Sequence, residues 1–320
     1  MSDNKYLVMD FGGTFIKYGL ADDEAHLLEQ DKIPSVRDNQ DAFFASLEPV
    51  FAKYRGKIKG CAVSMPGRID TKNGIAITAG ALTRIFKDVP VGPIISEKLG
   101  VPVTVGNDGK CAAAAELWTG ALKDVENGAA LVFGTAIAGG IIINHRIYMG
   151  SSWTAGELSN VIYDGPAMYS GFLEAKNFHE YLASGKKPFW WASASATSIT
   201  YEYSKAKGLN PENAVSGEEV FEAYRNGDKD AIKVLKDFAE VTAVGIMSLQ
   251  AVLDLEAVAI GGGISAAPEL VPLVADTVHD LWIQQKRSYP CLEPRIVKCV
   301  YGNDANLLGA LKLHLDEQGG

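Results

Sequence analysis

One pattern in the sequence constrains the fold more than any other: two strand-like segments joined by a glycine-bearing turn, present twice. Near the N-terminus, Tyr6–Phe11 and Phe15–Leu20 flank the turn Gly12-Gly13-Thr14. About 125 positions later, Ala130–Phe133 and Ile141–Ile143 flank a second turn that is also rich in glycine. Apolar runs bounded by glycine are typical of hairpins. The repetition predicts two similarly built α/β halves, each opening with a hairpin.

The size and charge of the chain narrow the function classes. The 320 residues include 47% hydrophobic and 22% charged residues, and the formal net charge is −9. A chain of this length can bury a large core and typically forms about two domains. Because neutralising phosphates requires Lys and Arg on one face, the acidic balance argues against nucleic acid or an anionic membrane as partner. We expect an α/β protein with domains at 1–118 and 119–320.

Cysteine usage and hydropathy bear on the compartment. The longest apolar stretch, Ala129–Ile143, is interrupted by glycines, and its 15 residues fall short of the about 20 that a spanning helix needs. The chain has no apolar leader, and its four cysteines do not form a CxxC motif. We therefore expect a cytoplasmic protein without a membrane segment.

Polar, glycine-bearing turns follow two further strand-like segments. Gly60–Met65 ends at Pro66-Gly67, and Val101–Val105 ends at the run Gly106-Asn107-Asp108-Gly109. Functional groups in open α/β sheets gather at the carboxyl ends of strands, so Asp108 is a candidate functional residue. A helix is expected to follow it from Lys110 to Leu117, and the last helix is expected at about 305–316.

The glycine turns suit a phosphate ligand. Backbone N–H groups in a tight glycine turn form a positive concavity, and the missing Cβ lets a ligand come close. The chain has no GxxxxGK[ST], so it is not a P-loop protein. The segment Gly261–Ala266 fits the loose dinucleotide pattern GxGxx[GA], although it lies far from an opening βαβ unit. A dinucleotide-dependent oxidoreductase is therefore one alternative.

Six motifs together resemble the ROK family of sugar kinases in order and approximate spacing. The resemblance covers nearly the whole chain and implies the two-domain fold shared by hexokinase, actin and Hsp70, the actin-like ATPase (ribonuclease H-like) type. It also implies ATP in a cleft between the domains, and the final helix packing back on the first domain. The motifs are Asp10-Phe11-Gly12-Gly13-Thr14, Ser64-Met65-Pro66-Gly67-Arg68-Ile69-Asp70, Asn107-Asp108, Gly134-Thr135, Ala155-Gly156-Glu157 and Ile260-Gly261-Gly262-Gly263.

The resemblance implies a role for the pair Asn107-Asp108. Transfer of a phosphoryl group to a sugar hydroxyl requires late removal of a proton, a task for a carboxylate. By resemblance Asp108 is that base, and Asn107 bonds a sugar hydroxyl. The alternative is structural: Asn107-Asp108-Gly109 forms a turn that caps the following helix.

The resemblance also implies a nucleotide and metal site. Asp10 would hold Mg²⁺ through water, because an isolated buried carboxylate is costly. The alternative is a turn aspartate that bonds the amides of Gly12 or Gly13. Thr14 and Lys17 would lie near the phosphates, although Lys17 could instead point outward from its strand. The remaining implied nucleotide contacts are Gly12, Gly13, Gly134 and Thr135 for the phosphates and Gly261, Gly262 and Gly263 for adenine and ribose.

The sequence departs from the family pattern at the second turn and at the zinc site. Ala136 and Ala138 stand where the family has glycine, so either these positions are not left-handed or the turn is remodelled. Glu157-Leu158-Ser159-Asn160 replaces the usual zinc-site beginning, and no cysteine occurs between Cys111 and Cys291. We therefore expect no structural zinc.

The sugar ligands implied by the resemblance are Gly67, Asn107, Asp108, Glu157 and, at the former histidine position, Asn160. Glu157 could alternatively cap a helix. An aromatic-rich insertion at 161–191 could form a stacking wall for a larger sugar, or it could be a small satellite core or a dimer contact. The expected substrate is a hexose, an amino sugar or a β-glucoside, and the expected assembly is a homodimer.

A non-catalytic sugar-binding regulator of the same family is a further alternative. A repressor would need a DNA-binding module before the first hairpin, where only Met1 to Lys5 stand. A silent sugar-binding protein would be expected to lack the acid at position 108. Both observations favour the kinase.

Overall fold

The structure, a computed structural model, describes residues 4–169, 178–211, 215–288, 290–302 and 304–319. These residues form two compact units, described here one at a time. Unit 1 comprises Met1–Asp124, Gly140–Gly156 and Asn303–Gly320, and unit 2 comprises Val125–Gly139 and Glu157–Gly302. The boundary expected between 118 and 119 stays a prediction, because packing units need not be independently folding domains.

Two five-stranded sheets follow the same plan. The first has the order β3-β2-β1-β4-β7 and the second β10-β9-β8-β11-β12. In each, the opening strand has the next two strands of the chain on one side and two parallel strands on the other. The prediction of two similarly built halves is confirmed. The strands are β1 (Lys5–Phe11), β2 (Phe15–Asp22), β3 (Leu27–Pro34), β4 (Gly60–Met65), β7 (Val103–Asn107), β8 (Gly128–Phe133), β9 (Ile137–Ile143), β10 (Arg146–Ile147), β11 (Ala257–Gly261) and β12 (Arg295–Lys298), with a separate small pair, β5 (Ile69–Asp70) and β6 (Ile75–Ala76).

The helices divide between the units. Those of unit 1 are α1 (Gln40–Tyr54), α2 (Val91–Leu99), α3 (Asp108–Trp118) and α11 (Ala305–Gly319), with the 3-10 helix η1 (Gly80–Leu82). Those of unit 2 are α4 (Gly165–Tyr169), α5 (Phe178–Ala183), α6 (Trp190–Ser193), α7 (Ala196–Ala206), α8 (Gly217–Arg225), α9 (Lys229–Leu253) and α10 (Leu270–Gln285), with η2 (Leu158–Asn160) and η4 (Gly263–Ala266).

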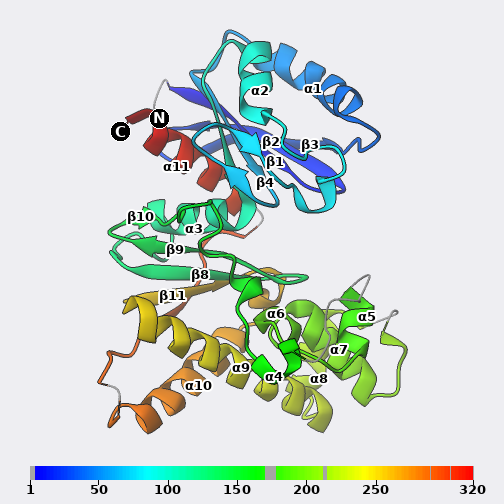
Figure 1. The fold of residues 1–320 in the computed structure, drawn as a ribbon, viewed down its shortest axis with the longest axis vertical. Helices are drawn as coiled ribbons and strands as arrows, with labels where there is room; N and C mark the ends of the chain where they lie inside the picture. The colour runs from blue at the N-terminus through cyan, green and yellow to red at the C-terminus, as the bar shows by residue number, and fades with distance from the viewer. Residues whose placement is uncertain (1–3, 170–177, 212–214, 289, 303, 320) are drawn as a thin grey trace. The chain divides into compact units, whose positions relative to one another are not determined.

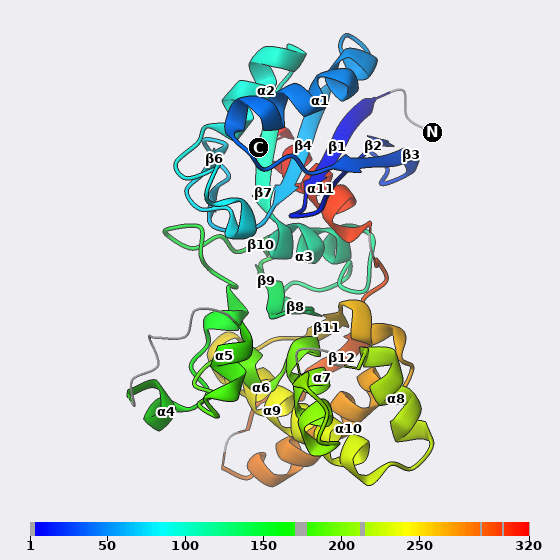
Figure 2. The same cartoon turned by 90° about the vertical axis from the view of Figure 1, so that its right-hand side faces the viewer.

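Alternation along β1 gives the first sheet its two faces. Leu7, Met9 and Phe11 are fully buried in one core cluster with the apolar side chains of α1 and α2. Because successive strand residues point to opposite faces, Asp10 points to the other face. Helix α11 lies against that face, and Figures 1 and 2 show it beside β1 and β4 although it ends the chain. The penultimate residue of a buried strand is thus brought next to the C-terminal helix.

Helix α11 packs closely on the sheet. A Cβ at Gly60 would lie 2.2 Å from Nε2 of His314, so only glycine leaves room for the ring. The His314 ring is also 2.9 Å, Nδ1 to Oγ1, from the hydroxyl of Thr104. Burial lowers the pKa of His314 to about 4. The ring is therefore neutral at pH 7, as this apolar setting requires.

The second hairpin differs from the sequence-based expectation. Strand β9 begins at Ile137, so Gly139 and Gly140 lie inside a strand instead of in the turn. A Cβ at Gly139 would lie 2.1 Å from the carbonyl oxygen of Ala130, and one at Gly140 would lie 2.7 Å from Cβ of Ala113. These glycines permit close packing, and the turn is only Gly134-Thr135-Ala136.

Among the described residues, no helix combines the length and the apolar character that crossing a membrane would demand.

Candidate functional site

Asp10 occupies the end of β1 with its carboxylate held by two donors. Its Oδ1 accepts a hydrogen bond from Oγ of Ser64 at 2.8 Å and one from Nδ2 of Asn306 at 3.2 Å. Burial raises the pKa of Asp10, and the Ser64 bond, the charge of Lys17 and the Asn306 bond oppose that rise. Strand pairing places Lys17 directly opposite Asp10. The carboxylate thus accepts hydrogen bonds from a neighbouring strand and from helix α11. The turn alternative required bonds from the Gly12 or Gly13 amides instead, and these are not what the structure shows.

The first glycine turn is shaped by a close backbone approach. The amide of Gly12 donates to the carbonyl oxygen of Phe15, and a Cβ at Gly12 would lie 2.8 Å from that oxygen. Neither Gly12 nor Gly13 has a positive φ. Glycine is therefore needed at Gly12 because a side chain would clash at the turn, and not because the backbone is left-handed. Thr14, which follows, is exposed.

Asn107 and Asp108 stand where β7 ends and α3 begins. Oδ1 of Asn107 accepts from the amide of Lys110 and caps the helix, as the structural alternative proposed. Its Nδ2 donates to the carbonyl oxygen of Gly67 and to Oδ1 of Asp108, which uses both amide protons. Asn107 could therefore meet a sugar only through the second lone pair of Oδ1. In the structure, the Asn107 side chain positions the carboxylate of Asp108.

The Asp108 carboxylate is oriented by its surroundings. Oδ1 accepts from the amide of Gly109 at 2.8 Å and from Nδ2 of Asn107 at 3.0 Å. The residue is partly exposed, whereas Asn107 is buried. A fixed, partly solvent-accessible carboxylate at the carboxyl end of a strand suits a general base.

Gly67 completes the loop that holds Asn107. Its φ of +97° is a conformation that other residues rarely adopt, and a Cβ there would lie 2.5 Å from the carbonyl oxygen of Thr78. The next residue, Arg68, is fixed by its amide to Oγ1 of Thr78 and by Nε to the carbonyl oxygen of Ser152. The carbonyl of Gly67 is thereby held toward Asn107.

Unit 2 contains a pocket of about 610 Å³ at the second hairpin turn. Three sequence candidates line it: Gly134, Thr135 and Gly263. Ala136 and Ala138 do not have positive φ values, so they are not left-handed, one of the two possibilities that the sequence left open. The remaining lining residues are Phe133, Ala196, Thr197, Thr200, Ser216, Gly217, Glu218, Phe221, Ile264, Ala266 and Ala267.

The wall of this pocket formed by α7 and α8 was not predicted from the sequence. Ser195 and Ser216 each begin a capping box before their helix. The pattern Ser216-Gly217-Glu218-Glu219 was readable as a helix start, but nothing local showed that this start faces Thr135. Thr197 and Thr200 carry no such signal at all.

Gly261 and Gly262 shape the pocket without lining it. Gly262 has a φ of +92° and a ψ of 170°, and a Cβ there would lie 2.1 Å from the carbonyl oxygen of Phe133. A Cβ at Gly261 would lie 2.9 Å from Sγ of Cys299. Gly262 lets η4 lie against the end of β8, which brings Gly263 to the pocket, whereas Gly261 makes room for Cys299.

Glu157 directly precedes η2 in unit 2, and Asn160 is the last residue of that helix. The Glu157 side chain makes no capping bond to η2, although it stands directly before it. Asn160 is exposed. The capping alternative for Glu157 is therefore not seen at this helix.

The aromatic insertion is partly a core. Trp190 is fully buried against Gly245, where a Cβ would lie 2.2 Å from the indole ring, and Trp191 is 7% exposed. Tyr163 is 40% exposed. The predictions for Tyr169, Phe172, Phe178 and Tyr181 fall on residues whose side chains lie outside the described set. Trp190 and Trp191 are therefore packed in the core of unit 2, as the satellite-core alternative proposed.

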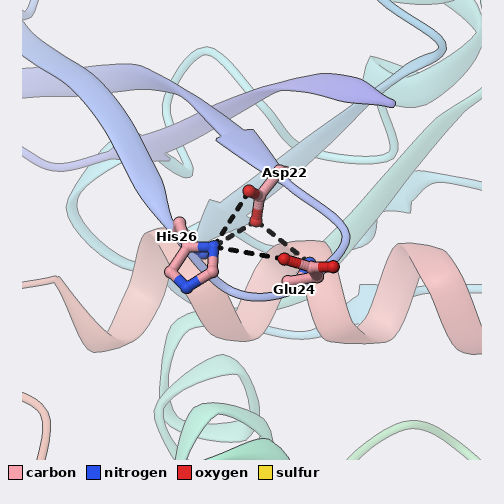
Figure 3. Close-up of side chains that lie close together, drawn as sticks. All are labelled: Asp22, Glu24 and His26. Carbon is pink, nitrogen blue, oxygen red and sulfur yellow. Dashed lines mark hydrogen bonds and ion pairs between the residues drawn. The ribbon is translucent and has the colours of Figure 1, made fainter. Parts of the chain in front are cut away.

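A cluster of Asp22, Glu24 and His26 lies outside these sites, in the turn between β2 and β3 (Figure 3). Oδ1 of buried Asp22 accepts from the amides of Glu24 and His26, and its Oδ2 lies 2.9 Å from Nδ1 of His26. Burial alone would raise the pKa of Asp22, but these bonds together hold it below its ordinary value. These hydrogen bonds stabilise the turn between β2 and β3.

Asp22→Ala is expected to cost about 1–3 kcal/mol of unfolding free energy at pH 7, because two amides and a ring nitrogen lose a buried acceptor. Asp22→Asn should cost less, since its oxygen can still accept from both amides. The folded-state pKa is depressed, so this stabilisation is present above the unfolded pKa of about 4 and is lost as pH falls through the folded value. Urea unfolding at pH 7 and pH 3 measures it, and an undiminished difference at pH 3 would count against the carboxylate as the cause.

Comparisons with known proteins match nearly the whole chain to one family. The model of the ROK family matches residues 6–317. A beta-glucoside kinase of Klebsiella pneumoniae is 26% identical over 310 residues, which cover 96% of this chain and 95% of the relative. A crystal structure of a ROK family protein from Streptococcus pneumoniae in complex with sucrose has a TM-score of 0.84 at 24% identity, covering 98% of this chain and 99% of that one. A ROK family glucokinase from Streptomyces griseus, in complex with glucose and AMPPNP, has a TM-score of 0.74 at 22% identity, covering 97% and 99%.

Proposed function

Because the chain belongs to the ROK family, we propose that it is an ATP-dependent sugar kinase that phosphorylates a hydroxyl of a hexose, an amino sugar or a β-glucoside. The observation that carries the proposal is the oriented carboxylate of Asp108, held by Gly109 and Asn107 at the start of α3. The named kinase among the relatives supports it.

The proposed reaction is an in-line displacement. The acceptor hydroxyl oxygen forms a bond to the γ-phosphorus while the bond between that phosphorus and the β-γ bridging oxygen breaks, releasing ADP. The hydroxyl proton passes to the Asp108 carboxylate late in the transfer. Asn107 acts by holding Asp108 and the Gly67 loop in register.

The pocket of unit 2 is the proposed nucleoside site. Its volume of about 610 Å³ is within the usual range for small-ligand pockets. Gly263 and the threonines of α7 would face adenine and ribose, and Gly134-Thr135 would face the phosphates. The AMPPNP-bound glucokinase supports ATP as the nucleotide.

The residues around Asp10 fit a magnesium ion held through water. Both donors, Ser64 and Asn306, bond Oδ1, which leaves Oδ2 for a metal-bound water. Magnesium would neutralise charge on the transferring phosphoryl group. Lys17, opposite Asp10, and Thr14 would add donors for phosphate oxygens.

Thr200→Trp tests the nucleoside site, because an indole on the pocket-facing side of α7 would occupy the space proposed for the nucleoside. We expect the KM for ATP to rise about tenfold or more, with a smaller change in the KM for sugar. Lys205→Trp is the matched control, since position 205 is an exposed position of the same helix. Initial-rate kinetics decide, and equal ATP KM values in the two variants would remove the nucleoside from this pocket.

The acceptor class is tested by kcat/KM for glucose, N-acetylmannosamine and cellobiose. A β-glucoside kinase should prefer cellobiose, in line with the Klebsiella relative. A strong preference for a monosaccharide would argue against a stacking wall from the 161–191 insertion. Sugar binding without turnover of any acceptor would favour the regulator alternative.

A further inference from the structure

A second pocket, of about 570 Å³, lies wholly in unit 1 and has no part in the function proposed above. One wall is the segment Ser35–Asp38, which connects β3 to α1. The other wall is formed by Ala81 and Leu82 of η1 and by Arg84 and Ile85 beyond it. Two arginines, Arg37 and Arg84, are therefore brought to one hollow from segments about 47 positions apart.

Arg37 and Arg84 differ from other arginines of the chain in their ion pairing. Other arginines of this acidic chain are engaged, as Arg55 is with Glu48 and Arg225 with Glu269. No ion pair in the described part of the chain involves Arg37 or Arg84. The one acidic side chain of the pocket is Asp38, so the lining keeps a net positive charge.

A hydroxyl group points to the same conclusion. Oγ of Ser35 is buried and has no hydrogen-bond partner among the described residues. Buried hydroxyls are nearly always bonded, so a missing partner calls for an explanation. Ser35 lines the same pocket as the two arginines, and a hydroxyl together with two guanidinium groups is a donor set that suits a phosphate or a carboxylate.

The pocket adjoins the proposed site for the acceptor and the phosphates. The Ser35 amide donates to the carbonyl oxygen of Thr14 at 2.9 Å. A Cβ at Gly13 would lie 3.7 Å from Cβ of Ala81, and one at Gly80 would lie 3.2 Å from Cβ of Pro66. Both walls of the pocket thus touch the loops that would hold the reacting groups.

We propose that this pocket binds an acidic substituent of the sugar acceptor, a phosphate or a carboxylate carried on the part of the acceptor that is not phosphorylated. Arg37 and Arg84 pair with the anion and the Ser35 hydroxyl donates to it. This inference rests on the proposed kinase function and adds the acceptor's chemical class: acidic glycosides are preferred over neutral ones.

The test uses acceptor pairs that differ in charge and little else. Cellobionate is compared with cellobiitol, and glucose 1-phosphate with methyl α-glucoside, by the ratio of kcat/KM for the acidic to the neutral member. In the wild type, this ratio should be about tenfold or more for at least one of the two pairs. A hydrogen bond to a charged group contributes enough binding free energy for a change of that size. Arg37→Ala and Arg84→Ala should each lower the ratio about tenfold or bring it to one. Arg287→Ala, at an exposed arginine of unit 2, should leave it unchanged.

Binding measured without turnover separates this inference from the kinase proposal. Calorimetry should show tighter binding of cellobionate than of cellobiitol in the wild type, and the difference should vanish in the double variant Arg37→Ala/Arg84→Ala. A ratio near one in the wild type, or one that survives both substitutions, overturns the inference even if neutral sugars are phosphorylated. Equal, arginine-dependent binding of inorganic phosphate and cellobionate also overturns it, because the pocket would then be a free-anion site. If no sugar is phosphorylated but the arginine-dependent preference holds in calorimetry, the kinase proposal fails and the pocket assignment stands.

Discussion

Asp108→Asn is expected to give a folded protein whose kcat is lower by about a hundredfold or more, because a positioned general base typically contributes about 10²–10⁴-fold. Asparagine has the shape of aspartate and can still accept the bond from the Gly109 amide, so the start of α3 should survive. What it cannot do is take the proton of the acceptor hydroxyl. The loss should appear in kcat far more than in the KM for ATP.

The same substitution separates catalysis from helix capping. The structure shows that Asn107, not Asp108, accepts the capping bond from Lys110. A purely structural role for Asp108 would therefore predict near-normal turnover in the asparagine variant. Asp124→Asn, at an exposed aspartate of unit 1, controls for a loss of charge alone. Steady-state kinetics with circular dichroism on all three proteins decide between the readings.

Gly262→Ala is expected to destabilise the protein by about 2–5 kcal/mol. The φ of +92° and ψ of 170° lie in a region essentially restricted to glycine, which costs other residues about 1–3 kcal/mol. The new Cβ would also meet the carbonyl oxygen of Phe133 at 2.1 Å, and because that atom is backbone, the end of β8 must move.

Gly263→Ala is the matched control for this prediction. The adjacent glycine has no positive φ, and a Cβ there would meet nothing within 4 Å, so the change in stability should be within about 0.5 kcal/mol. The midpoint of urea unfolding, followed by circular dichroism, measures both variants. If the two alanine variants unfold at the same urea concentration, the close approach of Gly262 to β8 is not what stabilises this turn.

The sequence predicted the parts of the fold that depend on local patterns. The strand-like run Tyr6–Phe11 and the glycine turn after it located the first hairpin, and the second occurrence of the pattern predicted the repeated sheet. The start of β9 was predicted wrongly from the sequence, because Gly139 and Gly140 look like turn residues. Their actual reason is close packing on Ala130 and Ala113, which only the folded chain reveals.

The candidate site was predictable where a residue ends its own strand and not where a distant element meets it. Asp10 and Asp108 stand at strand ends and could be selected in advance. Asn306 contacts Asp10 across 296 positions, and nothing near Asn306 in the sequence indicates that contact. Thr200 likewise looks like an ordinary helical residue, because its place in the pocket depends on how α7 packs beside Phe133 and Gly263.

The most direct test of the central claim is ADP release by the full chain, measured with Mg²⁺ and ATP over a panel of neutral and acidic sugars. The account predicts that at least one sugar stimulates ADP release strongly above the rate without sugar. It also predicts that chelating the metal abolishes this stimulation and that Asp108→Asn reduces it about a hundredfold or more. ATP turnover that no sugar stimulates, or stimulation that persists undiminished in Asp108→Asn, would contradict it.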